Sequence, residues 1–376
     1  MSEINASNFK KEHGDLAPDL VGVSDLTSPY FFVPPSGTTA ERPQDCEPGT
    51  LRFNTDHGSL EVFRGNMIGW EQIQRRESQY LGGGTNSNTG TGVRGFLGGG
   101  NAPAITNTIE FVTISTFGDT QDFGDITAAN RAYASSGSNT RGIFQNGGDP
   151  SSNIINYITI STTGNAQDFG DATVSAGYRA SFNNQVRSVT GGGNGGLNTV
   201  DYITIAQTGN AVDFGDLVAT GEVGDCSFSS TTRGIIAGGR NTNHIEKFTI
   251  MTEGNSTDFG DLSANTVVPF GCSNAIRGLM KLRTGSYINT VEFITIATTG
   301  NSVDFGDTSN GMKSGGGAGM ASATRALFAG GYGGTGGFQD GIESFEIATT
   351  GDSVNFGDMS YSADNLTGTS NGHGGL

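Results

Sequence analysis

The tetrapeptide Asp122-Phe123-Gly124-Asp125 decides the fold, because it or a close variant occurs six times along the chain. The last copy reads Asn355-Phe356-Gly357-Asp358. Counted between glycines, successive copies lie 46, 45, 45, 46 and 51 residues apart. A period of about 45 residues indicates structural repeats, each of which adds one supersecondary unit to a common core. The six glycines are Gly124, Gly170, Gly215, Gly260, Gly306 and Gly357.

Two further features recur upstream of each tetrapeptide. A segment rich in Ile, Val, Phe and Thr, such as residues 109–114, carries an acid at its second position in most copies. Still further upstream, an arginine opens a short apolar run that glycines usually close. These arginines are Arg94, Arg141, Arg187, Arg233, Arg277 and Arg325, and the acids that end the tetrapeptides are Asp125, Asp171, Asp216, Asp261, Asp307 and Asp358.

Short segments rich in Ile, Val, Phe and Thr and bounded by Gly and Asn are typical of β-strands. Each repeat contains four of them, and four strands per repeat between like neighbours predict the blade of a β-propeller. The chain is therefore predicted to be all-β, with six four-stranded blades. Residues 366–373 match the first strand of other repeats, whereas residues 85–92 contain no bulky apolar residue. We predict that this C-terminal strand completes blade 1; the alternative is a first blade built wholly from residues 80–125.

The repeats resemble the kelch and galactose-oxidase type of propeller. The resemblance rests on the Gly-Gly after the second strand, as in Gly238-Gly239, and on the acid and aromatic that begin the third, as in Asp201-Tyr202. It covers the chain from about residue 80 to the end. A kelch blade has Trp in its fourth strand, where this chain has Phe in all six repeats. The copper site of galactose oxidase, with two His and a Tyr–Cys pair, has no counterpart here.

Loop lengths vary on only one face of the predicted propeller. The third-strand position that holds an acid in most repeats always precedes the tetrapeptide glycine by 14 residues, whereas the arginine precedes that position by 13 to 18. Variation confined to one face is typical of the binding face of a repeat protein, although glycine-rich loops can also be tolerated filler. The candidate binding residues on these loops are Tyr332, Phe338, Lys313, Arg240 and Asn194.

The first 78 residues do not repeat. Residues 1–29 are predicted to form an extended arm, residues 30–78 a small β-hairpin module, and residues 79–376 the propeller. In the module, alternating runs flank Asp56-His57-Gly58, which is a hairpin signal, and Trp70 begins a third strand. A sheet of this size is marginal alone, so it is expected to dock on something. The candidate attachment residues are Tyr30, Phe31, Phe32 and Trp70.

The run from Leu51 to Phe63 with the downstream Trp70 resembles a short module of virion structural proteins of tailed bacteriophages. The match covers roughly residues 30–75. It implies a virion protein, such as a tail fibre or similar appendage, that is assembled in the host cytoplasm. The module would attach it to other virion proteins, and the resemblance also suggests a homotrimer. The alternative is that this segment is an ordinary three-stranded cap on the propeller.

Composition excludes several classes of protein. With 20 Lys and Arg against 37 Asp and Glu, the net charge of −17 repels nucleic acid. No apolar run approaches the ~18 residues of a membrane-spanning helix. The three cysteines and four histidines are scattered without ligand or catalytic spacing, so we expect no cofactor, no metal and no enzymatic activity. Six copies of Asp-Phe-Gly without a kinase nucleotide loop likewise argue against a kinase.

Two structural roles are expected for the repeated charges. The Asp residues should accept hydrogen bonds from backbone amides in tight turns. Each repeated Arg should pair with one of these acids in its own or the next blade. Cys226 and Cys272 fall in first strands and should be small buried residues.

The expected function is a non-enzymatic phage virion component that displays the propeller for binding to a host-surface glycan or protein. The first alternative is a purely structural decoration or adaptor subunit of the virion without a ligand. The second is a glycan-processing enzyme, because acids are abundant in the sequence.

Overall fold

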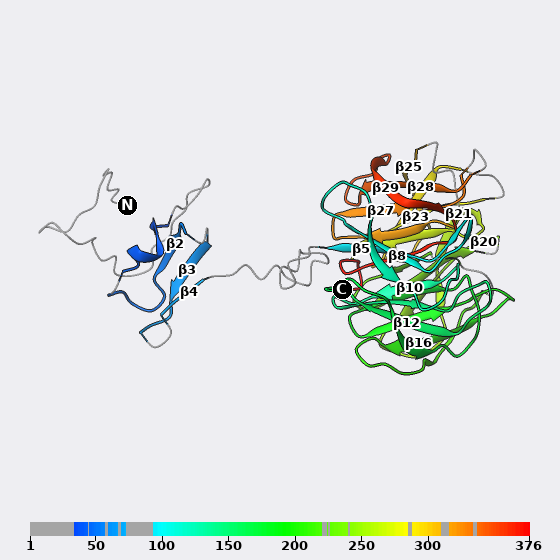
Figure 1. Cartoon of the computed structure of the whole chain (residues 1–376), viewed down its shortest axis with the longest axis horizontal. Helices are drawn as coiled ribbons and strands as arrows, with labels where there is room; N and C mark the ends of the chain where they lie inside the picture. Colours follow the sequence, from blue (N-terminus) through cyan, green and yellow to red (C-terminus); the bar gives the residue numbers. More distant parts are fainter. Residues whose placement is uncertain are drawn as a thin grey trace, which may run out of the picture. The chain divides into compact units, whose positions relative to one another are not determined.

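The computed structural model describes residues 34–43, 45–56, 59–66, 69–72, 93–219, 224, 226–239, 241–284, 288–309, 316–333 and 337–376. The chain divides into two compact units, Met1–Arg76 and Glu77–Leu376, called unit 1 and unit 2 below. The described residues form seven four-stranded sheets, one in unit 1 and six in unit 2, so this part of the protein is all-β (Figure 1). The described residues contain no α-helix, and thus none that could cross a membrane. The predicted arm and the predicted boundary near residue 78 lie outside them.

Five sheets of unit 2 each contain four antiparallel strands consecutive in the chain, so that each repeat builds one sheet. Repeats 2 and 3 comprise β10 (Ala134–Gly137), β11 (Arg141–Gln145), β12 (Ile154–Thr159), β13 (Gln167–Asp171), β14 (Ala180–Asn183), β15 (Arg187–Gly191), β16 (Thr199–Thr204) and β17 (Val212–Asp216). Repeats 4 to 6 comprise β18 (Ser227–Ser229), β19 (Arg233–Gly239), β20 (Thr242–Thr249), β21 (Thr257–Thr266), β22 (Phe270–Ser273), β23 (Arg277–Lys281), β24 (Thr290–Thr295), β25 (Val303–Asp307), β26 (Ala318–Ala321), β27 (Arg325–Ala329), β28 (Gln339–Glu346) and β29 (Val354–Ala363).

The sheet of repeat 1 joins the two ends of unit 2. Its strand order is β30 (Thr367–Ser370), β5 (Arg94–Gly98), β8 (Thr108–Thr113) and β9 (Gln121–Asp125), with a small β6–β7 hairpin (Asn101–Ala102 and Ala104–Ile105) after β5. β30 pairs antiparallel with β5, and Figure 1 shows the C-terminus beside the cyan β5. The prediction that the C-terminus supplies the first strand of this sheet is therefore confirmed.

The six sheets of unit 2 contact one another in a cyclic order. The first strands touch in the series β30, β10, β14, β18, β22, β26 and again β30. Six hydrophobic clusters follow the same order, and each combines side chains of two consecutive repeats. The sixth places Phe356 of repeat 6 with Val112 and Ile114 of repeat 1. Both faces of the third strands are thus covered, which is why these strands are apolar on both sides.

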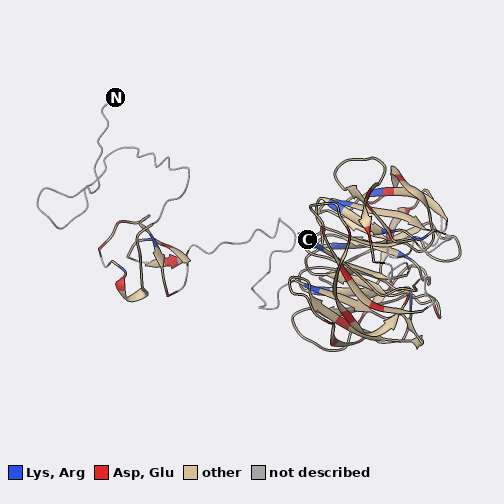
Figure 2. Cartoon of the chain, turned by 90° about the horizontal axis from the view of Figure 1, so that it is seen from above, with Lys and Arg blue, Asp and Glu red and all other residues tan. Residues whose placement is uncertain are grey.

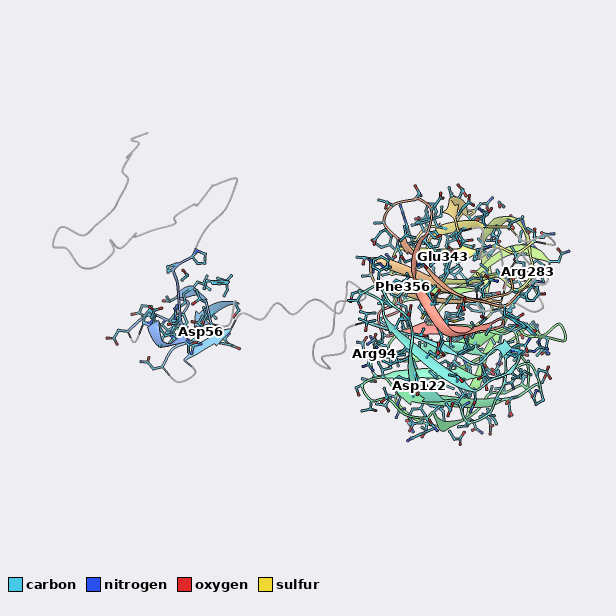
Figure 3. The ribbon with its side chains drawn as sticks, turned by 45° about the horizontal axis from the view of Figure 1, so that its top comes forward. Asp56, Arg94, Asp122, Arg283, Glu343 and Phe356 are labelled. Atoms are coloured by element: carbon cyan, nitrogen blue, oxygen red, sulfur yellow. The ribbon has the colours of Figure 1, made fainter. Side chains whose placement is uncertain are left out.

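Unit 2 has two faces defined by its loops. The 1–2 and 3–4 hairpins of the sheets form the hairpin face, and the 2–3 loops and the connections between repeats form the connection face. Figure 3 shows Arg94, which begins β5 at the hairpin face, and Arg283, in the 2–3 loop of repeat 5, on opposite sides of unit 2. The loops of variable length therefore all belong to the connection face.

The first strands enclose a small polar cavity of about 40 Å³ along the middle of unit 2. Serine hydroxyls from several repeats line it, together with Cys272, which is buried as predicted, as is Cys226. The chain after β30 covers the hairpin end of this cavity. There the Gly374 amide donates to the Ser273 carbonyl at 2.9 Å, and His373 Nε2 contacts the Gly137 carbonyl at 2.9 Å. These bonds join the C-terminal segment to repeats 5 and 2.

His373 is expected to make the stability of unit 2 depend on pH. Its Nδ1 accepts a hydrogen bond from the Gly375 amide, and burial lowers its pKa from 6.5 to about 4. As the pH falls from 6.5 to 4, the unfolded chain binds this proton and the folded chain does not, so up to about 3 kcal/mol of stability is lost. Urea unfolding at pH 7 and pH 4.5 should show a smaller pH difference for His373→Gln than for the wild type. An equal difference in the two proteins would contradict this role.

Unit 1 is one small sheet of β1 (Ser36–Gly37), β2 (Leu51–Asn54), β3 (Ser59–Phe63) and β4 (Trp70–Gln72). The predicted hairpin and third strand are confirmed, and β2 and β3 pair from Leu51–Val62 to Asn54–Ser59. No pattern in the sequence predicts β1, a two-residue strand that runs parallel to β2. A single 3-10 turn, Thr39–Glu41, follows it.

Candidate functional site

The tetrapeptide glycine lets consecutive sheets approach closely. Gly260 has φ +153°, and a Cβ there would lie 2.3 Å from the carbonyl oxygen of Gly300 in the next repeat. The preceding phenylalanine, Phe259, is the extra residue of a β-bulge and points into the core with 2% exposure. Gly357 meets the Gly118 carbonyl of repeat 1 in the same way. The repeated Phe-Gly is thus the contact between neighbouring sheets.

In the described part of the chain the repeated aspartates bond to the next repeat through their amides, and of their carboxylates that of Asp261 lies 3.5 Å from His244 Nδ1. In all six repeats the amide donates to an Asn or Asp side chain in the 3–4 hairpin of the next repeat, and the Asp358 amide donates to Asp119 of repeat 1 at 3.0 Å. The prediction that the aspartate side chains are the acceptors was therefore wrong, because the acceptor belongs to the neighbouring hairpin. The other five pairs are Asp125–Asn165, Asp171–Asn210, Asp216–Asn255, Asp261–Asn301 and Asp307–Asp352.

The repeated arginines also bridge consecutive sheets, but their partners differ from the predicted ones. Arg233 Nη1 donates to the Ile296 carbonyl, which follows the third strand of the next repeat, at 2.7 Å. Arg325 of repeat 6 reaches the Ile114 carbonyl of repeat 1 at 3.0 Å. In the described part of the chain no repeated Arg forms an ion pair with a tetrapeptide Asp, so the predicted pairing was wrong. The other arginine–carbonyl bonds are Arg94–Ile160, Arg141–Ile205 and Arg277–Ile347; Arg187 instead pairs with Glu253.

Replacing Arg233 with Met should lower the free energy of unfolding by about 1–2 kcal/mol, because the Ile296 carbonyl loses a charged donor. In repeat 4 this bond can be tested without a stacking contact. Its third strand has Lys247 where four other repeats have an aromatic residue that can stack against the arginine. Thermal unfolding should show a midpoint a few degrees lower. Arg64→Met, at an exposed pair with Glu71, is the control and should change the midpoint little. An unchanged melting midpoint for Arg233→Met would contradict a stabilising role for the Arg233–Ile296 bond.

The third-strand acids form a further set of contacts between repeats. Glu292 accepts hydrogen bonds from Ser302 of its own repeat and from Ser263 of the preceding one. Glu110 of repeat 1 accepts from Ser360 of repeat 6. These carboxylates are almost fully buried, at 2% exposure for both Glu110 and Glu292. The third-strand acids on which the kelch resemblance rests therefore connect neighbouring sheets. Their hydrogen bonds are satisfied, as is usual for buried polar groups.

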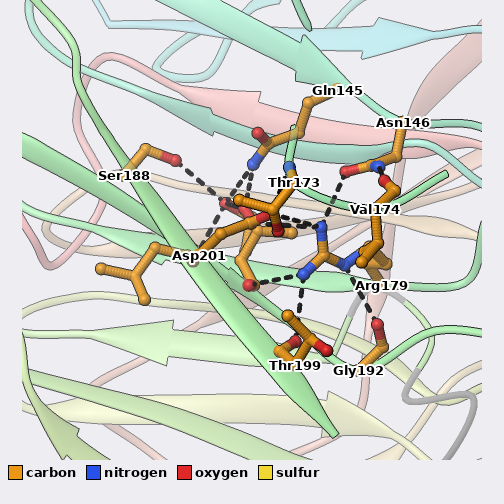
Figure 4. Close-up of polar contacts among 12 residues, drawn as sticks. Gln145, Asn146, Thr173, Val174, Arg179, Ser188, Gly192, Thr199 and Asp201 are labelled. Carbon is orange, nitrogen blue, oxygen red and sulfur yellow. Dashed lines mark hydrogen bonds and ion pairs between the residues drawn. The ribbon is translucent and has the colours of Figure 1, made fainter. Parts of the chain in front are cut away.

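Repeat 3 contains a buried ion pair that no repeat pattern predicts. The fully buried Arg179 lies 3.1 Å from Asp201 and also donates to the carbonyls of Gly192, Thr190 and Thr199 (Figure 4). Asp201 in turn accepts from the amide and hydroxyl of Thr173 in the preceding connection. The pair thus fixes the connection-face end of this sheet.

Of the candidate binding residues, Tyr332 and Phe338 lie together on the connection face. Their residues form a β-bridge, and their half-buried rings meet edge to face, with centroids 5.6 Å apart. They form an ordered aromatic pair and not two separate loop side chains. Asn194 accepts a hydrogen bond from the Gly177 amide at 3.1 Å, so it orders the loop. Lys313 and Arg240 lie outside the described residues.

At the connection face, the space in the middle of unit 2 is lined by one residue with a left-handed backbone from each repeat. These residues precede the first strands, and the Ala132 amide donates to the Asn365 carbonyl at 2.8 Å, joining repeats 2 and 1. Val268 has φ 49°, which is rare for a β-branched residue, so the local backbone is strained. A hollow of about 10 Å³ remains between them. The six residues are Ala132, Tyr178, Gly224, Val268, Gly316 and Asn365.

Two charged residues lie next in sequence to residues that line this hollow, and no sequence motif marks them. Arg131 and Asp364 immediately precede the left-handed residues of repeats 2 and 1. The corresponding positions in repeats 3 and 5 hold Gly177 and Val267, so an alignment of repeats extended through the connections could have singled them out. Over unit 2 as a whole, acidic and basic positions are interspersed (Figure 2).

Unit 1 has a polar covered face and an apolar open face. On the covered face Glu61 is fully buried and pairs with Arg42 at 2.6 Å and with Arg52 at 3.2 Å. The hydrogen bonds from Arg42 are the main cause that lowers the pKa of Glu61. On the opposite face Leu51 and Leu60 are 46% and 40% exposed.

Trp70 packs on Phe63 in this sheet with ring centroids 5.4 Å apart, and the Arg52 guanidinium lies 5.8 Å from the Trp70 ring centroid. The Trp70 side chain is half-buried, so part of its surface is available for contact. The other predicted attachment residues, Tyr30, Phe31 and Phe32, lie outside the described residues.

No family model and no curated protein matches the sequence. Within the described segments, no three His, Cys, Asp or Glu side chains gather where they could hold a metal ion. The two arrangements that stand out are the aromatic and charged residues of the connection face and the open apolar face of unit 1.

Proposed function

We propose that unit 2 is a six-bladed, kelch-like β-propeller closed by its C-terminal strand. The support is the cyclic series of contacts: each bond type between consecutive repeats recurs between repeat 6 and repeat 1, as Asp358–Asp119 and Arg325–Ile114 illustrate. Repeats that contact only their two neighbours and return to the first are typical of propellers.

We propose that the protein is a non-enzymatic component of the virion of a tailed bacteriophage, such as a tail fibre. Unit 1 attaches it to other virion proteins, and the connection face of unit 2 binds a host-surface glycan or protein. The resemblance of residues 30–75 to a phage virion module supports the virion assignment. The open face with Leu51 and Leu60 supports attachment, because a small sheet normally buries its apolar side.

The observation that carries the binding role is the composition of the connection face. It combines the variable loops, the ordered Tyr332–Phe338 pair and the strained backbone around Val268. Aromatic rings among polar groups suit both sugar and protein ligands. Backbone strain also clusters at functional sites.

A purely structural decoration or adaptor subunit is the second candidate. The observation that favours it is the nearly filled axis of unit 2, where the cavity of about 40 Å³ can hold a few water molecules but no sugar. A ligand would therefore have to bind on the surface of the connection face.

The full chain tested on a glycan array and on intact host cells distinguishes the candidates. Binding to cells or glycans that is lost with Tyr332→Ala would support the proposed function. Absence of binding to either, with the protein located in the virion by cryo-electron microscopy, would favour the structural role. Release of sugars from host polysaccharide would instead indicate an enzyme, and absence from the virion would overturn the virion assignment.

A further inference from the structure

Most of the exposed large apolar side chains of unit 2 lie at its hairpin face. Within the described part of this unit, only Ile154 and Val218 of the set belong to the connection face. The others lie in a 1–2 or 3–4 hairpin or begin a fourth strand directly after a 3–4 hairpin. They are Phe117, Val186, Val212, Met251, Ile276, Val303 and Val354. Apolar side chains gathered at one face are typical of an interaction surface, whereas singly scattered ones are not.

The repeat itself does not require these apolar residues. Ile276, which precedes the arginine of repeat 5, is 64% exposed, and three other repeats have Thr at this position. Met251 is 50% exposed, and every other repeat has Ser or Ala in its place. A polar or small residue therefore serves the fold at both positions, and the apolar side chains are available for contact with another molecule.

The apolar side chains are spread over five consecutive repeats, from repeat 3 through repeat 6 to repeat 1. Where the series closes, the exposed Phe117 of repeat 1 lies against Phe356 of repeat 6, with ring centroids 5.3 Å apart. Figure 3 shows Phe356 on the same side of unit 2 as Arg94. Repeat 2 instead has Thr140 and Gln167 at two of these positions. The set thus extends around most of the hairpin face, as a broad contact with a partner requires.

The charges at the hairpin face are mainly acidic. None of its described hairpin loops contains Lys or Arg, whereas Asp119, Glu253 and Asp352 are exposed there. The arginines that begin the second strands are already bonded to carbonyls of the next repeat or, for Arg187, paired with Glu253. A complementary partner therefore combines apolar side chains with Lys or Arg. A second copy of this chain would bring the same acids against one another.

We propose that the hairpin face docks unit 2 onto a protein whose surface presents apolar side chains bordered by Lys and Arg, and that this protein belongs to the virion structure that holds unit 1. The chain that comes from unit 1 enters unit 2 at Val93, directly before β5 and thus at the hairpin face. The covalent link to the attachment module and the apolar side chains therefore share one face, which leaves the connection face open for a host ligand. This inference rests on the proposed virion assignment.

Hydrogen exchange of the full chain, free in solution and within purified virions, tests the docking. Backbone amides of residues 115–120, 184–187, 251–256 and 274–277 should exchange at least tenfold more slowly in the virion. Residues 146–153 of the connection face should exchange equally in both states. Equal exchange throughout unit 2 would overturn the docking and leave attachment through unit 1 intact. Absence of the protein from the virion would overturn the virion assignment together with this inference.

Ile276→Lys is the decisive variant, because it replaces an apolar contact with a charge that a basic partner repels. In virions it should abolish the protection of the hairpins, while the number of copies per virion stays at the wild-type value because unit 1 still attaches the chain. Val218→Lys, at a similarly exposed apolar residue of the connection face, is the matched control and should leave the protection unchanged. If Ile276→Lys does not fold, the wild-type comparison decides.

The charge of the partner is tested by Ile276→Glu, which should weaken the protection less than Ile276→Lys does. The reverse order would contradict a basic partner. Sedimentation equilibrium of the free chain tests the alternative occupant, and we expect a single species whose mass does not change with concentration. Self-association that protects the same hairpins would identify a second copy as the occupant and overturn the assigned partner.

Discussion

Removal of residues 364–376 is expected to unfold unit 2 or to reduce its free energy of unfolding by more than about 5 kcal/mol, which is comparable to the whole stability of many domains. The deletion takes away β30, so that β5 loses its antiparallel partner along Gly95–Gly98. It also removes the contacts of β30 with β26 and β10 and the buried Leu366. Thermal unfolding followed by circular dichroism at 218 nm or by calorimetry measures the loss.

A shorter deletion of residues 371–376 is the matched control. It keeps β30 and removes only the segment over the cavity, including the Gly374–Ser273 bond. We expect a lower midpoint with a transition that is still cooperative. A synthetic peptide of residues 364–376 added to the longer deletion should restore part of the stability, because an added strand can pair with an open sheet edge. If the longer deletion unfolds at the same temperature as the full chain, β30 does not hold unit 2 together.

Replacement of Arg179 with Met should destabilise unit 2 by about 3–5 kcal/mol, because the substitution leaves the buried Asp201 carboxylate without its cation. The carbonyls of Gly192, Thr190 and Thr199 also lose their donor. For a domain of this size the melting midpoint should fall by about 5–8 °C. Calorimetry of the purified variant measures the change.

The double variant Arg179→Met with Asp201→Asn distinguishes the ion pair from simple loss of packing. Because it leaves no unpaired charge, its destabilisation should be clearly smaller than the sum of the two single changes. Additive effects would show that the pair contributes no coupling energy. A loss below about 1 kcal/mol for Arg179→Met would contradict the assigned role of this network.

The sequence was enough to predict the strands of unit 2 because six copies of one pattern reinforce each other. The fixed spacing between the third-strand acid and the tetrapeptide placed the 3–4 hairpin in every repeat, including repeat 1. The C-terminal strand could be assigned because residues 366–373 repeat the pattern of other first strands. By contrast, the two-residue strand at Ser36 has no pattern, since parallel pairing of so short a segment depends on its partner β2.

The partners of the repeated side chains were harder to predict. The arginines bond to backbone carbonyls such as that of Ile296, and a carbonyl leaves no mark in the sequence. The hairpin residue that receives each aspartate amide did leave a mark, since Gly-Asn or Gly-Asp precedes every tetrapeptide at the same spacing, as in Gly164-Asn165. Arg131 and Asp364 are separated by most of the chain, and only the cyclic order of the repeats brings them together.

Native-state hydrogen exchange of the six tetrapeptide aspartate amides tests most directly whether the repeats form one closed ring. Five of these amides bond to the next repeat along the chain, and the sixth, that of Asp358, bonds to Asp119 of repeat 1. In a closed propeller Asp358 should be protected to the same degree as Asp125, Asp171, Asp216, Asp261 and Asp307, and all six should open together as denaturant is added. Rapid exchange at Asp358 with continued protection at the other five would show an open array of repeats and contradict the account.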